Sequence, residues 1–347
     1  MDIDIFICKF GSGHLKAATE LKNKLQDLNG VDINIIDFIE SVYPKLSDLI
    51  YWTHKQYYQH KILNLEEKQT RDNNLNRELT AKILMLKKLF FKYLDSRPWP
   101  DVFISCFSLT SYLISEYKKE RKLDIPLITF ITDFSFHKFW INENTNLYLV
   151  MSNFTKQKLI KVGIEPENII IFGNKIKSSS EKSNQNILIC GGGLGILPNN
   201  KKFYKKLEKF EDKNFKIVFG KNKNLYDSVS KLKLKNVITY GLVDDMEKFY
   251  DWADIYITKA GGLSIYDSIK NTLPIVYFTP FLSQEIKNKE FIDTEKIGLE
   301  LKNENLKILE MLFKNNQKLE LIRDNLERIR DDFSPDELLR WLENAVY

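Results

Sequence analysis

Short apolar segments alternate with amphipathic helical stretches along almost the whole chain of 347 residues. Such alternation is typical of βαβ units, in which parallel strands are buried between helices. In the first half we expect strands at residues 3–8, 33–36, 102–106, 127–131, 147–151 and 169–172. In the second half we expect them at residues 187–190, 216–219, 237–240, 255–258 and 275–278. The pattern therefore predicts an α/β protein built on parallel sheets.

A polar stretch without strong periodicity, residues 174–185, divides this pattern and predicts an interdomain linker. A chain of this length is too long for one ordinary core and suits two domains. We therefore expect an amino-terminal domain over residues 1–174 and a second domain over residues 186–332.

Beyond Gly298 the sequence predicts only helices. Ser334 followed by Pro335 is typical of a helix start, with serine as the cap and proline at the first helical position. We expect a separate final helix over residues 333–347.

The composition is that of a soluble globular protein, with 43% hydrophobic and 29% charged residues. No apolar run approaches the ~20 residues that a membrane span needs, and the first strand is too short and too acidic for a secretory signal. Cys8, Cys106 and Cys190 are widely spaced and form no Cys-x-x-Cys pair, which disfavours disulfides and zinc. We therefore expect a protein of the reducing cytoplasm.

The net charge of +5 is mild and comes mainly from lysine. It would favour an anionic membrane surface by about 1 kcal/mol for each well-placed Lys or Arg. Binding of nucleic acid would need a denser basic stripe or a recognisable module, and the sequence has neither. We expect no nucleic acid partner.

Aromatic and basic residues interleave in the region 43–63. They are Tyr43, Tyr51, Trp52, Tyr57 and Tyr58 with Lys45, Lys55 and Lys61. Such an amphipathic segment suits a membrane interface. It equally suits a helix whose rings pack in the core, and the sequence leaves both interpretations open. The next helix, over about residues 75–94 with Leu84 and Phe90, is expected to pack in the core.

The most informative turn follows the strand expected at residues 255–258, where Gly261 and Gly262 precede a short helix. In α/β proteins, ligands bind beyond the carboxyl ends of the strands. A glycine pair there lets backbone N–H groups approach an anion at the helix N terminus. One helical turn later, Asp267 is placed to accept hydrogen bonds from a ribose.

Gln284 and Glu285 follow the next strand, in what we interpret as a polar loop, and their spacing suits contacts with sugar hydroxyls. Phosphate, ribose and sugar contacts would then occur in chain order. This order indicates that the second domain binds a nucleotide-sugar.

Gly11, Ser12, Gly13 and His14 follow the first strand and open a helix. The glycines permit a tight turn, and the helix N terminus disfavours a protonated imidazole. A neutral His14 in a cleft is a usable general base for an acceptor hydroxyl. The same residues also suit an ordinary strand-to-helix turn with a polar cap.

Three further side chains follow the strand at residues 127–131. Asp133 is either a second base or the partner that orients His14. His137 and Trp140 lie downstream on an expected loop, where they either meet the acceptor or pack between domains.

The glycine run 191–193 follows another strand and suits a phosphate-facing turn. It lacks the Gly-x-Gly-x-x-Gly spacing of dinucleotide sites. Asp244 and Asp245 follow a strand too, but adjacent acids at a helix start are more often caps than metal ligands. We expect no metal requirement.

Together these motifs resemble those of GT-B glycosyltransferases of the MurG-like group, most closely the diacylglycerol glycosyltransferases. That subgroup comprises the monogalactosyldiacylglycerol synthases and the processive diacylglycerol glucosyltransferases. Five segments carry the resemblance in the family's order: 10–14, 132–134 with His137 and Trp140, 191–195, 219–222, and 257–267 with its continuation to Gln284 and Glu285.

The resemblance implies the GT-B fold, with two Rossmann-like domains facing a cleft and a last helix that crosses back to the first domain. It implies transfer of a hexose from a UDP-sugar to a lipid hydroxyl, that of diacylglycerol, with inversion, at the inner face of the cell membrane and without a cofactor. The donor would contact Gly192, Gly193, Lys221, Val243, Lys259, Gly261, Gly262, Ser264, Asp267, Gln284 and Glu285. The catalytic residues would be His14 and Asp133, with Gly11, Ser12, Gly13, His137 and Trp140 toward the acceptor.

The chain departs from the family pattern at three points. Ala260 stands where proline is common, residues 173–175 replace a Gly-Ile-Pro, and Asp267 stands where glutamate is usual. Aspartate is one methylene shorter, so the ribose contact is the one most affected. Two alternatives remain: a glycosyltransferase of this fold with a soluble acceptor, and a non-catalytic protein that binds nucleotide-sugars.

Overall fold

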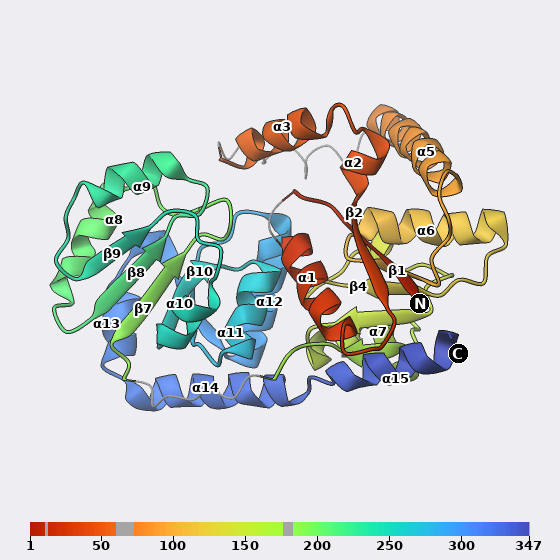
Figure 1. The fold of residues 1–347 in the computed structure, drawn as a ribbon. Helices are drawn as coiled ribbons and strands as arrows, with labels where there is room; N and C mark the ends of the chain where they lie inside the picture. Colours follow the sequence, from red (N-terminus) through yellow and green to blue (C-terminus); the bar gives the residue numbers. More distant parts are fainter. Residues whose placement is uncertain (11–12, 60–72, 176–182, 347) are drawn as a thin grey trace.

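The computed structural model describes residues 1–10, 13–59, 73–175 and 183–346. Its two halves each contain a six-stranded sheet in which every pair of neighbours is parallel. Figure 1 shows the two sheets side by side, each covered by helices. The predicted α/β architecture with two parallel sheets is confirmed.

The first sheet has the strand order β2-β1-β3-β4-β5-β6. Its strands are β1 (Asp2–Ile7), β2 (Asp32–Asp37), β3 (Val102–Ser105), β4 (Leu127–Phe130), β5 (Leu147–Val150) and β6 (Ile169–Ile171). The helices around it are α1 (Gly13–Leu25), α2 (Phe38–Val42), α3 (Ser47–Gln59), α5 (Asn73–Asp95), α6 (Ser108–Arg121) and α7 (Asn153–Lys161). The inner strands β1, β3, β4 and β5 are almost continuously buried, as expected for parallel strands covered on both faces, whereas the edge strand β2 is partly exposed.

The second sheet has the order β12-β11-β10-β7-β8-β9. Its strands are β7 (Asn186–Cys190), β8 (Asn214–Val218), β9 (Val237–Tyr240), β10 (Ile255–Lys259), β11 (Ile275–Phe278) and β12 (Gly298–Leu301). Its helices are α8 (Lys201–Lys205), α9 (Lys223–Ser230), α10 (Glu247–Trp252), α11 (Gly262–Lys270), α12 (Ser283–Glu295), α13 (Lys307–Phe313) and α14 (Asn316–Asp331).

Every strand expected from the sequence is present, with ends that differ by no more than two residues. The expectation of helices alone beyond Gly298 is wrong, because residues 298–301 form the edge strand β12. This strand has only four residues and is mostly half-buried, so it lacks the fully apolar run that marks the central strands.

The last helix, α15 (Pro335–Val346), crosses back to the amino-terminal domain, as expected. The Ser334 N–H donates to the Ile171 carbonyl at the end of β6 (2.8 Å), and Asp336 pairs with Lys24 of α1 (2.8 Å). In Figure 1, α14 and α15 run beneath both domains, and both chain termini lie on the amino-terminal side. The junction is tight: a Cβ on Gly173 would lie 2.5 Å from the Phe333 ring.

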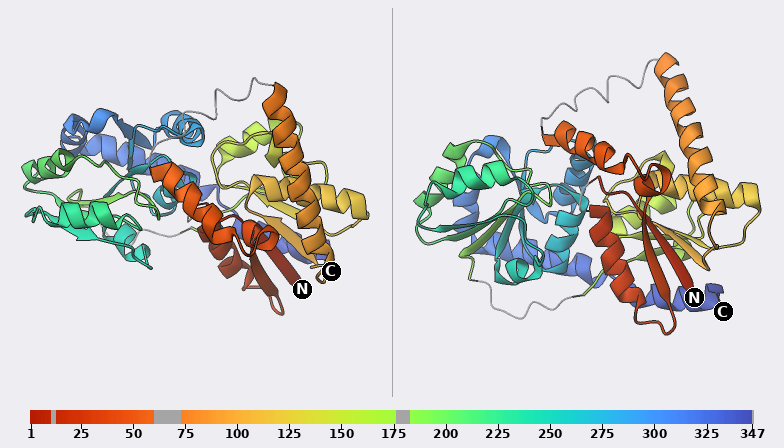
Figure 2. Two further views of the ribbon diagram at one scale, coloured as in Figure 1. Left: turned by 90° about the horizontal axis from the view of Figure 1, so that it is seen from above. Right: turned by 45° about the horizontal axis from the view of Figure 1, so that its top comes forward.

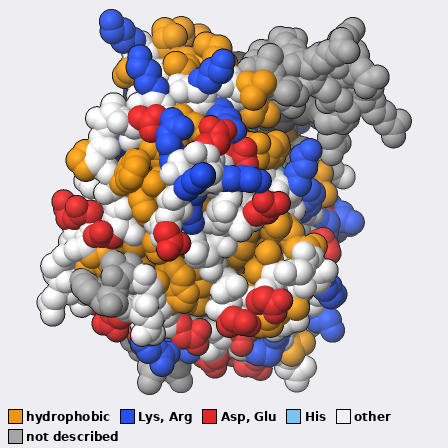
Figure 3. All heavy atoms as spheres, turned by 90° about the vertical axis from the view of Figure 1, so that its right-hand side faces the viewer, with side chains coloured by type: hydrophobic (Ala, Val, Ile, Leu, Met, Phe, Trp, Pro, Cys, Tyr) orange, Lys and Arg blue, Asp and Glu red, His pale blue; other side chains and the backbone are white. Residues whose placement is uncertain are grey.

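Helices α3 and α5 extend along one side of the amino-terminal domain (Figure 2). Trp52 is 56% exposed and Leu84 is 53% exposed, so the expectation that Leu84 packs in the core is wrong, although Phe90 on the same helix is buried. Seen from the outer side of this domain, hydrophobic side chains toward the top lie among Lys and Arg side chains (Figure 3). No helix in the described ranges combines the length and the apolarity of a membrane span.

Candidate active site

A cavity of about 270 Å³ lies where the two domains face each other. Its walls come from segments that follow strands β1, β3, β4, β7, β10 and β11, the place where α/β proteins bind ligands. The lining residues are Phe10, Gly13, His14, Phe107, Thr132, Asp133, Gly191, Gly192, Gly193, Leu194, Ile196, Lys259, Gly261, Gly262, Leu263, Ser264, Leu282, Gln284 and Glu285. The fold thus brings eleven of the site residues expected from the sequence into one cavity.

His14 lies in the first turn of α1, at the amino-terminal wall of the cavity. Its Nδ1 lies 2.8 Å from the Cys8 carbonyl oxygen, which can only accept, so Nδ1 carries the proton and Nε2 has the free lone pair. Burial lowers the pKa of His14. The Cys8 carbonyl and the Asp133 and Asp37 carboxylates raise this pKa, but burial is the larger effect. The ring is therefore a neutral base with a fixed tautomer.

Asp133 follows β4 and is buried in the same cavity. Its Oδ1 accepts from Asn288 Nδ2 (3.0 Å) and its Oδ2 accepts from Gln284 Nε2, both from the opposite domain. Burial raises the pKa of Asp133. The two amides and the charges of His14 and Lys259 lower this pKa, but burial is the larger effect. The hydrogen bond that orients His14 is made to the Cys8 carbonyl rather than to Asp133, so of the two alternatives for Asp133, second base or orienting partner, the orienting one is not seen here.

Gly262 begins α11 directly against the amino-terminal domain. A Cβ at this position would lie 2.2 Å from the Thr132 carbonyl oxygen and 2.6 Å from Asp133 Oδ1. The glycine is therefore required by the close approach of the two domains. The N-cap, Gly261, has no side chain that could bond the first N–H groups of α11.

The turn after β7 supplies a second set of glycines. Gly192 has a φ of +70°, which favours glycine, and a Cβ on Gly191 would lie 2.5 Å from the Ile196 nitrogen. The Lys221 N–H donates to the Gly193 carbonyl (2.9 Å), which ties this turn to the one after β8. The glycine turns after the neighbouring strands β7 and β10 thus both line the cavity.

Lys259 and Glu285 form an ion pair on the carboxy-terminal wall, with 2.9 Å between Nζ and Oε1. Gln284 and Glu285 belong to the first turn of helix α12, so the polar loop that we expected there is wrong. On the helix, Gln284 and Asn288 are four residues apart and share one face, from which both reach Asp133.

Comparison with known proteins matches both halves of the chain to glycosyltransferase families. Residues 14–176 match the monogalactosyldiacylglycerol (MGDG) synthase family, and residues 186–332 match the glycosyltransferase family 28 C-terminal domain.

The chain is a GT-B glycosyltransferase of the MurG-like group.

Its curated relatives include processive diacylglycerol β-glucosyltransferases. The one from Bacillus subtilis (strain 168) is 24% identical over 314 residues, which cover 83% of this chain and 80% of the relative. The one from Bacillus licheniformis is 23% identical over 369 residues, covering 97% of this chain and 93% of the relative.

Solved structures share the fold of the glycosyltransferase over its whole length. MurG of Acinetobacter baumannii superposes with a TM-score of 0.67 at 14% identity, covering 99% of each chain. The UDP-GlcNAc 2-epimerase of Neisseria meningitidis, solved with UDP-GlcNAc bound, has a TM-score of 0.61 at 14% identity and covers 99% of this chain and 100% of its own. At such identities these structures establish the fold alone.

Several site residues expected in the glycosyltransferase lie away from the cavity. Lys221 is exposed, and Val243 packs in an apolar cluster with Tyr250. His137 is exposed, whereas Trp140 is buried in a core cluster of the amino-terminal domain. Gly11 and Ser12 lie outside the described residues, as do the side chains of Lys55, Tyr57, Tyr58 and Lys61.

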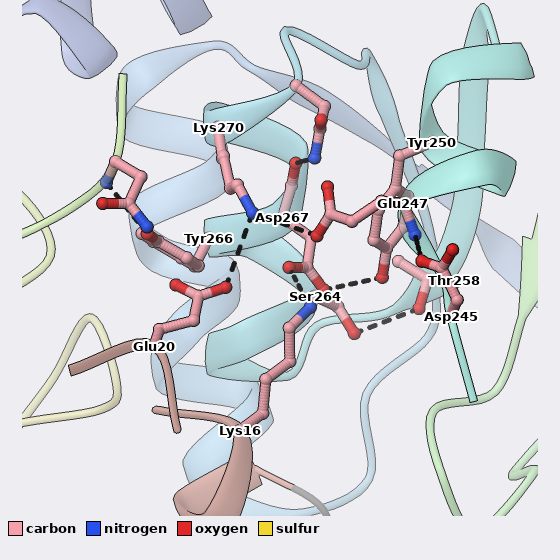
Figure 4. A network of polar contacts seen from close by, with 12 residues as sticks. Lys16, Glu20, Asp245, Glu247, Tyr250, Thr258, Ser264, Tyr266, Asp267 and Lys270 are labelled. Atoms are coloured by element: carbon pink, nitrogen blue, oxygen red, sulfur yellow. Dashed lines mark hydrogen bonds and ion pairs between the residues drawn. The ribbon is translucent and has the colours of Figure 1, made fainter. Parts of the chain in front are cut away.

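Asp267 is also absent from the cavity lining, although it lies one turn beyond Gly262 on α11. It is only 4% exposed, and its carboxylate accepts from Lys16 Nζ (2.5 Å) and from the Tyr250 hydroxyl (2.7 Å). Figure 4 shows these contacts between α1, α10 and α11. The ribose contact expected for Asp267 therefore has a competing partner from the other domain.

Among the described residues of the glycosyltransferase, no group of three or more His, Cys, Asp or Glu side chains is arranged to hold a metal ion. Asp245 accepts from the Glu247 N–H (3.0 Å) at the start of α10, which is a capping contact. Cys8, Cys106 and Cys190 are buried free thiols, and burial raises the pKa of Cys8 to about 12 and that of Cys190 to about 11.

Sequence reasoning missed two residues that join the domains. Asn288 is fully buried and bridges Asp133 and the Ala260 carbonyl (3.1 Å). A helix assignment for this segment would place Asn288 on the same face as Gln284, four residues earlier, and would therefore predict that both reach the site. Lys16 gives no such signal, because its partner Asp267 is 251 residues away in the chain.

Proposed function

We propose that this glycosyltransferase moves a hexose from a UDP-sugar to a hydroxyl of diacylglycerol, or of its glycosylated form, with inversion at the anomeric carbon. The match to the MGDG synthase family and the names of the curated relatives support a glycolipid product, and the family 28 match supports glycosyl transfer. The observation that carries the chemistry is the His14 ring, fixed through Nδ1 in the cavity opposite the glycine turns of the other domain.

His14 acts as the general base. Its Nε2 takes the proton of the acceptor hydroxyl while the acceptor oxygen attacks the anomeric carbon and the bond to the UDP oxygen breaks. The negative charge of Asp133 beside it stabilises the imidazolium that forms, without a direct hydrogen bond to Nδ1.

The UDP leaving group is stabilised by backbone N–H groups. The N terminus of α11 at Gly262 and the turn at Gly192 and Gly193 face the cavity and suit a diphosphate. Lys259 adds a positive charge to the same wall, and its pairing with Glu285 fixes both side chains toward the hexose.

The lipid acceptor enters from the membrane surface. Leu49 and Trp52 on α3 and Met85 on α5 are each more than half exposed, and the lysines Lys45, Lys88 and Lys92 are exposed on the same helices and their junctions. Apolar side chains bordered by lysine suit peripheral binding to an anionic membrane, here the inner face of the cell membrane.

The proposal is tested by a transfer assay that crosses UDP-glucose, UDP-galactose and UDP-N-acetylglucosamine with diacylglycerol in anionic vesicles. His14→Ala is expected to reduce transfer by roughly 100-fold to 10,000-fold while UDP affinity, measured by calorimetry, stays within about threefold of wild type. Thr19→Ala, an exposed change on the same helix, is the matched control and keeps wild-type transfer. Robust transfer by His14→Ala would remove His14 from the role of base.

The acceptor class is tested separately by vesicle flotation. The wild type is expected to float with anionic vesicles, and the double variant Leu49→Asp and Trp52→Asp to remain in the soluble fraction. If the wild type does not float with vesicles but glycosylates a water-soluble acceptor, the assignment of a lipid acceptor is overturned.

A further inference from the structure

Each carboxylate oxygen of Asp267 already accepts a hydrogen bond. One carboxylate oxygen accepts from Lys16 Nζ at 2.5 Å and the other from the Tyr250 hydroxyl at 2.7 Å. The Lys16 ammonium also lies 5.3 Å from the centre of the Tyr250 ring, so the three groups form one closed cluster (Figure 4). Lys16 comes from the amino-terminal domain and the other two residues come from the carboxy-terminal domain.

A second contact joins the same two helices one turn further along. Glu20 of α1 lies 3.6 Å from the Lys270 ammonium of α11, which also pairs with Glu247 of α10 (3.0 Å). Lys16 and Glu20 are four residues apart, and Asp267 and Lys270 are three apart, so each pair lies on one face of its helix. The charges alternate in sign across the interface, which fixes the register of α1 against α11.

Asp267 and Lys270 are largely withdrawn from water, whereas the Lys16 side chain is 31% exposed. The Asp267 side chain is 6% exposed and that of Lys270 is 7%, whereas exposed pairs contribute little. Burial lowers the pKa of Lys16, but the Asp267, Glu20 and Glu247 carboxylates outweigh it and raise the pKa overall. A buried charge that loses its partner is strongly destabilised, so Asp267 in this closed arrangement depends on Lys16.

The Lys16–Asp267 contact also joins the two helices that contribute to the proposed reaction. His14 precedes Lys16 by two residues on α1, and Gly262 precedes Asp267 by five residues on α11. The ion pair therefore connects the helix that carries the base to the helix whose N terminus faces the leaving group.

We propose that Lys16 is a positioning residue which, with Asp267, latches the two domains in the arrangement that places His14 over the donor. The Asp267 carboxylate serves this latch in place of a ribose contact. The role in transfer rests on the proposed function, whereas the latch itself and the lack of ribose recognition do not.

The experiment compares Lys16→Met, Asp267→Asn and the double variant with the wild type. Each single variant is expected to lower kcat by roughly 10-fold to 100-fold, since misplacement by about 1 Å can cost that much. The double variant is expected to match the single ones, because both remove the same contact. Lys16→Arg, which keeps the charge, is expected to recover most of kcat. Lys22→Met is the matched control, because Lys22 on the same helix bonds the Ile33 carbonyl within its own domain (3.1 Å).

Two further measurements do not depend on transfer. The wild type and Asp267→Asn are expected to bind UDP and 2′,3′-dideoxy-UDP with affinities within about threefold of each other. Small-angle scattering is expected to give a larger radius of gyration for Lys16→Met and Asp267→Asn than for the wild type and Lys22→Met. If no donor and acceptor give transfer with the wild type, the proposed function fails and these two readouts still decide the latch.

The proposal is overturned if the wild type prefers UDP over the dideoxy analogue by tenfold or more and Asp267→Asn abolishes that preference. It is equally overturned if Lys16→Met keeps both the kcat and the radius of gyration of the wild type.

Discussion

Two buried aspartates, one in each domain, are each held by the opposite domain, but with different chemistry. Asp133 of the amino-terminal domain accepts from the neutral amides of Gln284 and Asn288, whereas Asp267 of the carboxy-terminal domain pairs with the ammonium of Lys16. Asp133 lines the cavity, and Asp267 does not. A carboxylate held by amides keeps its net charge available to its surroundings, while one paired with lysine is neutralised. The arrangement around Asp133 suits a role in the transfer reaction, and that around Asp267 suits a role in holding the two domains together.

Of the changes that test this comparison, the largest effect on transfer is expected from adding a side chain at Gly262, where Asp133 lies against the other domain. Gly262→Ala would place a Cβ 2.2 Å from the Thr132 carbonyl oxygen, so the domains must move apart, and transfer is expected to fall by roughly 100-fold or more. Steady-state transfer kinetics provide the measurement. Gly241→Ala is the matched control, because its Cβ would meet nothing within 4 Å and activity should be kept. An active Gly262→Ala enzyme would mean that this closed contact is not needed for transfer.

A smaller effect is expected when Asp133 loses its charge. Asp133→Asn turns an NH₂ group toward one of two amide donors, and the free energy of unfolding is expected to fall by about 1–3 kcal/mol. Transfer is expected to fall roughly tenfold to 100-fold, because the imidazolium of His14 loses a neighbouring charge. Chemical denaturation and transfer kinetics measure the two quantities. Asp245→Asn, which can still cap α10, is the control and should change neither.

The smallest effect is a shift of the pH profile. A base works in its neutral form, so transfer is present above the pKa of His14 and is lost as the pH falls through it. Because burial lowers that pKa from 6.5, the acidic limb of kcat/KM for the wild type is expected below pH 6.5. The Asp133 carboxylate raises the pKa of His14, so Asp133→Asn is expected to move the limb further down. Lys16→Met is expected to leave the limb in place, and an equal shift in both variants would contradict the distinction between the two aspartates.

Much of the fold follows from the sequence because it depends on local patterns. Buried parallel strands are short apolar runs, and glycine turns after them are visible in one dimension, so the strands and most of the cavity lining could be predicted. The edge strand β12 could not, because Gly298–Leu301 is short and half-buried. The sequence predicts a loop at the start of α12, because Ser283, Gln284 and Glu285 are polar and follow a proline at position 280.

The partners of the site residues could not be predicted in the same way. The Cys8 carbonyl that orients His14 is a backbone group with no sequence signature, and the contacts from Asp133 to Asn288 and from Asp267 to Lys16 join residues more than 150 positions apart. Such pairs depend on how two folded domains meet. The residue types therefore predict the chemistry of the site, and the docking of the domains decides which carboxylate performs it.

The chain passes between the domains twice, once from β6 to β7 and once from α14 to α15. These passages lie together, because Gly173 meets the Phe333 ring and the Asn174 N–H donates to the Tyr266 hydroxyl (3.0 Å). A body tethered at two neighbouring points can rotate about the line through them but cannot translate freely. Nucleotide entry and product release would then be swings about one pivot, and shortening the chain before α15 would remove half of that pivot without touching a single group in the cavity.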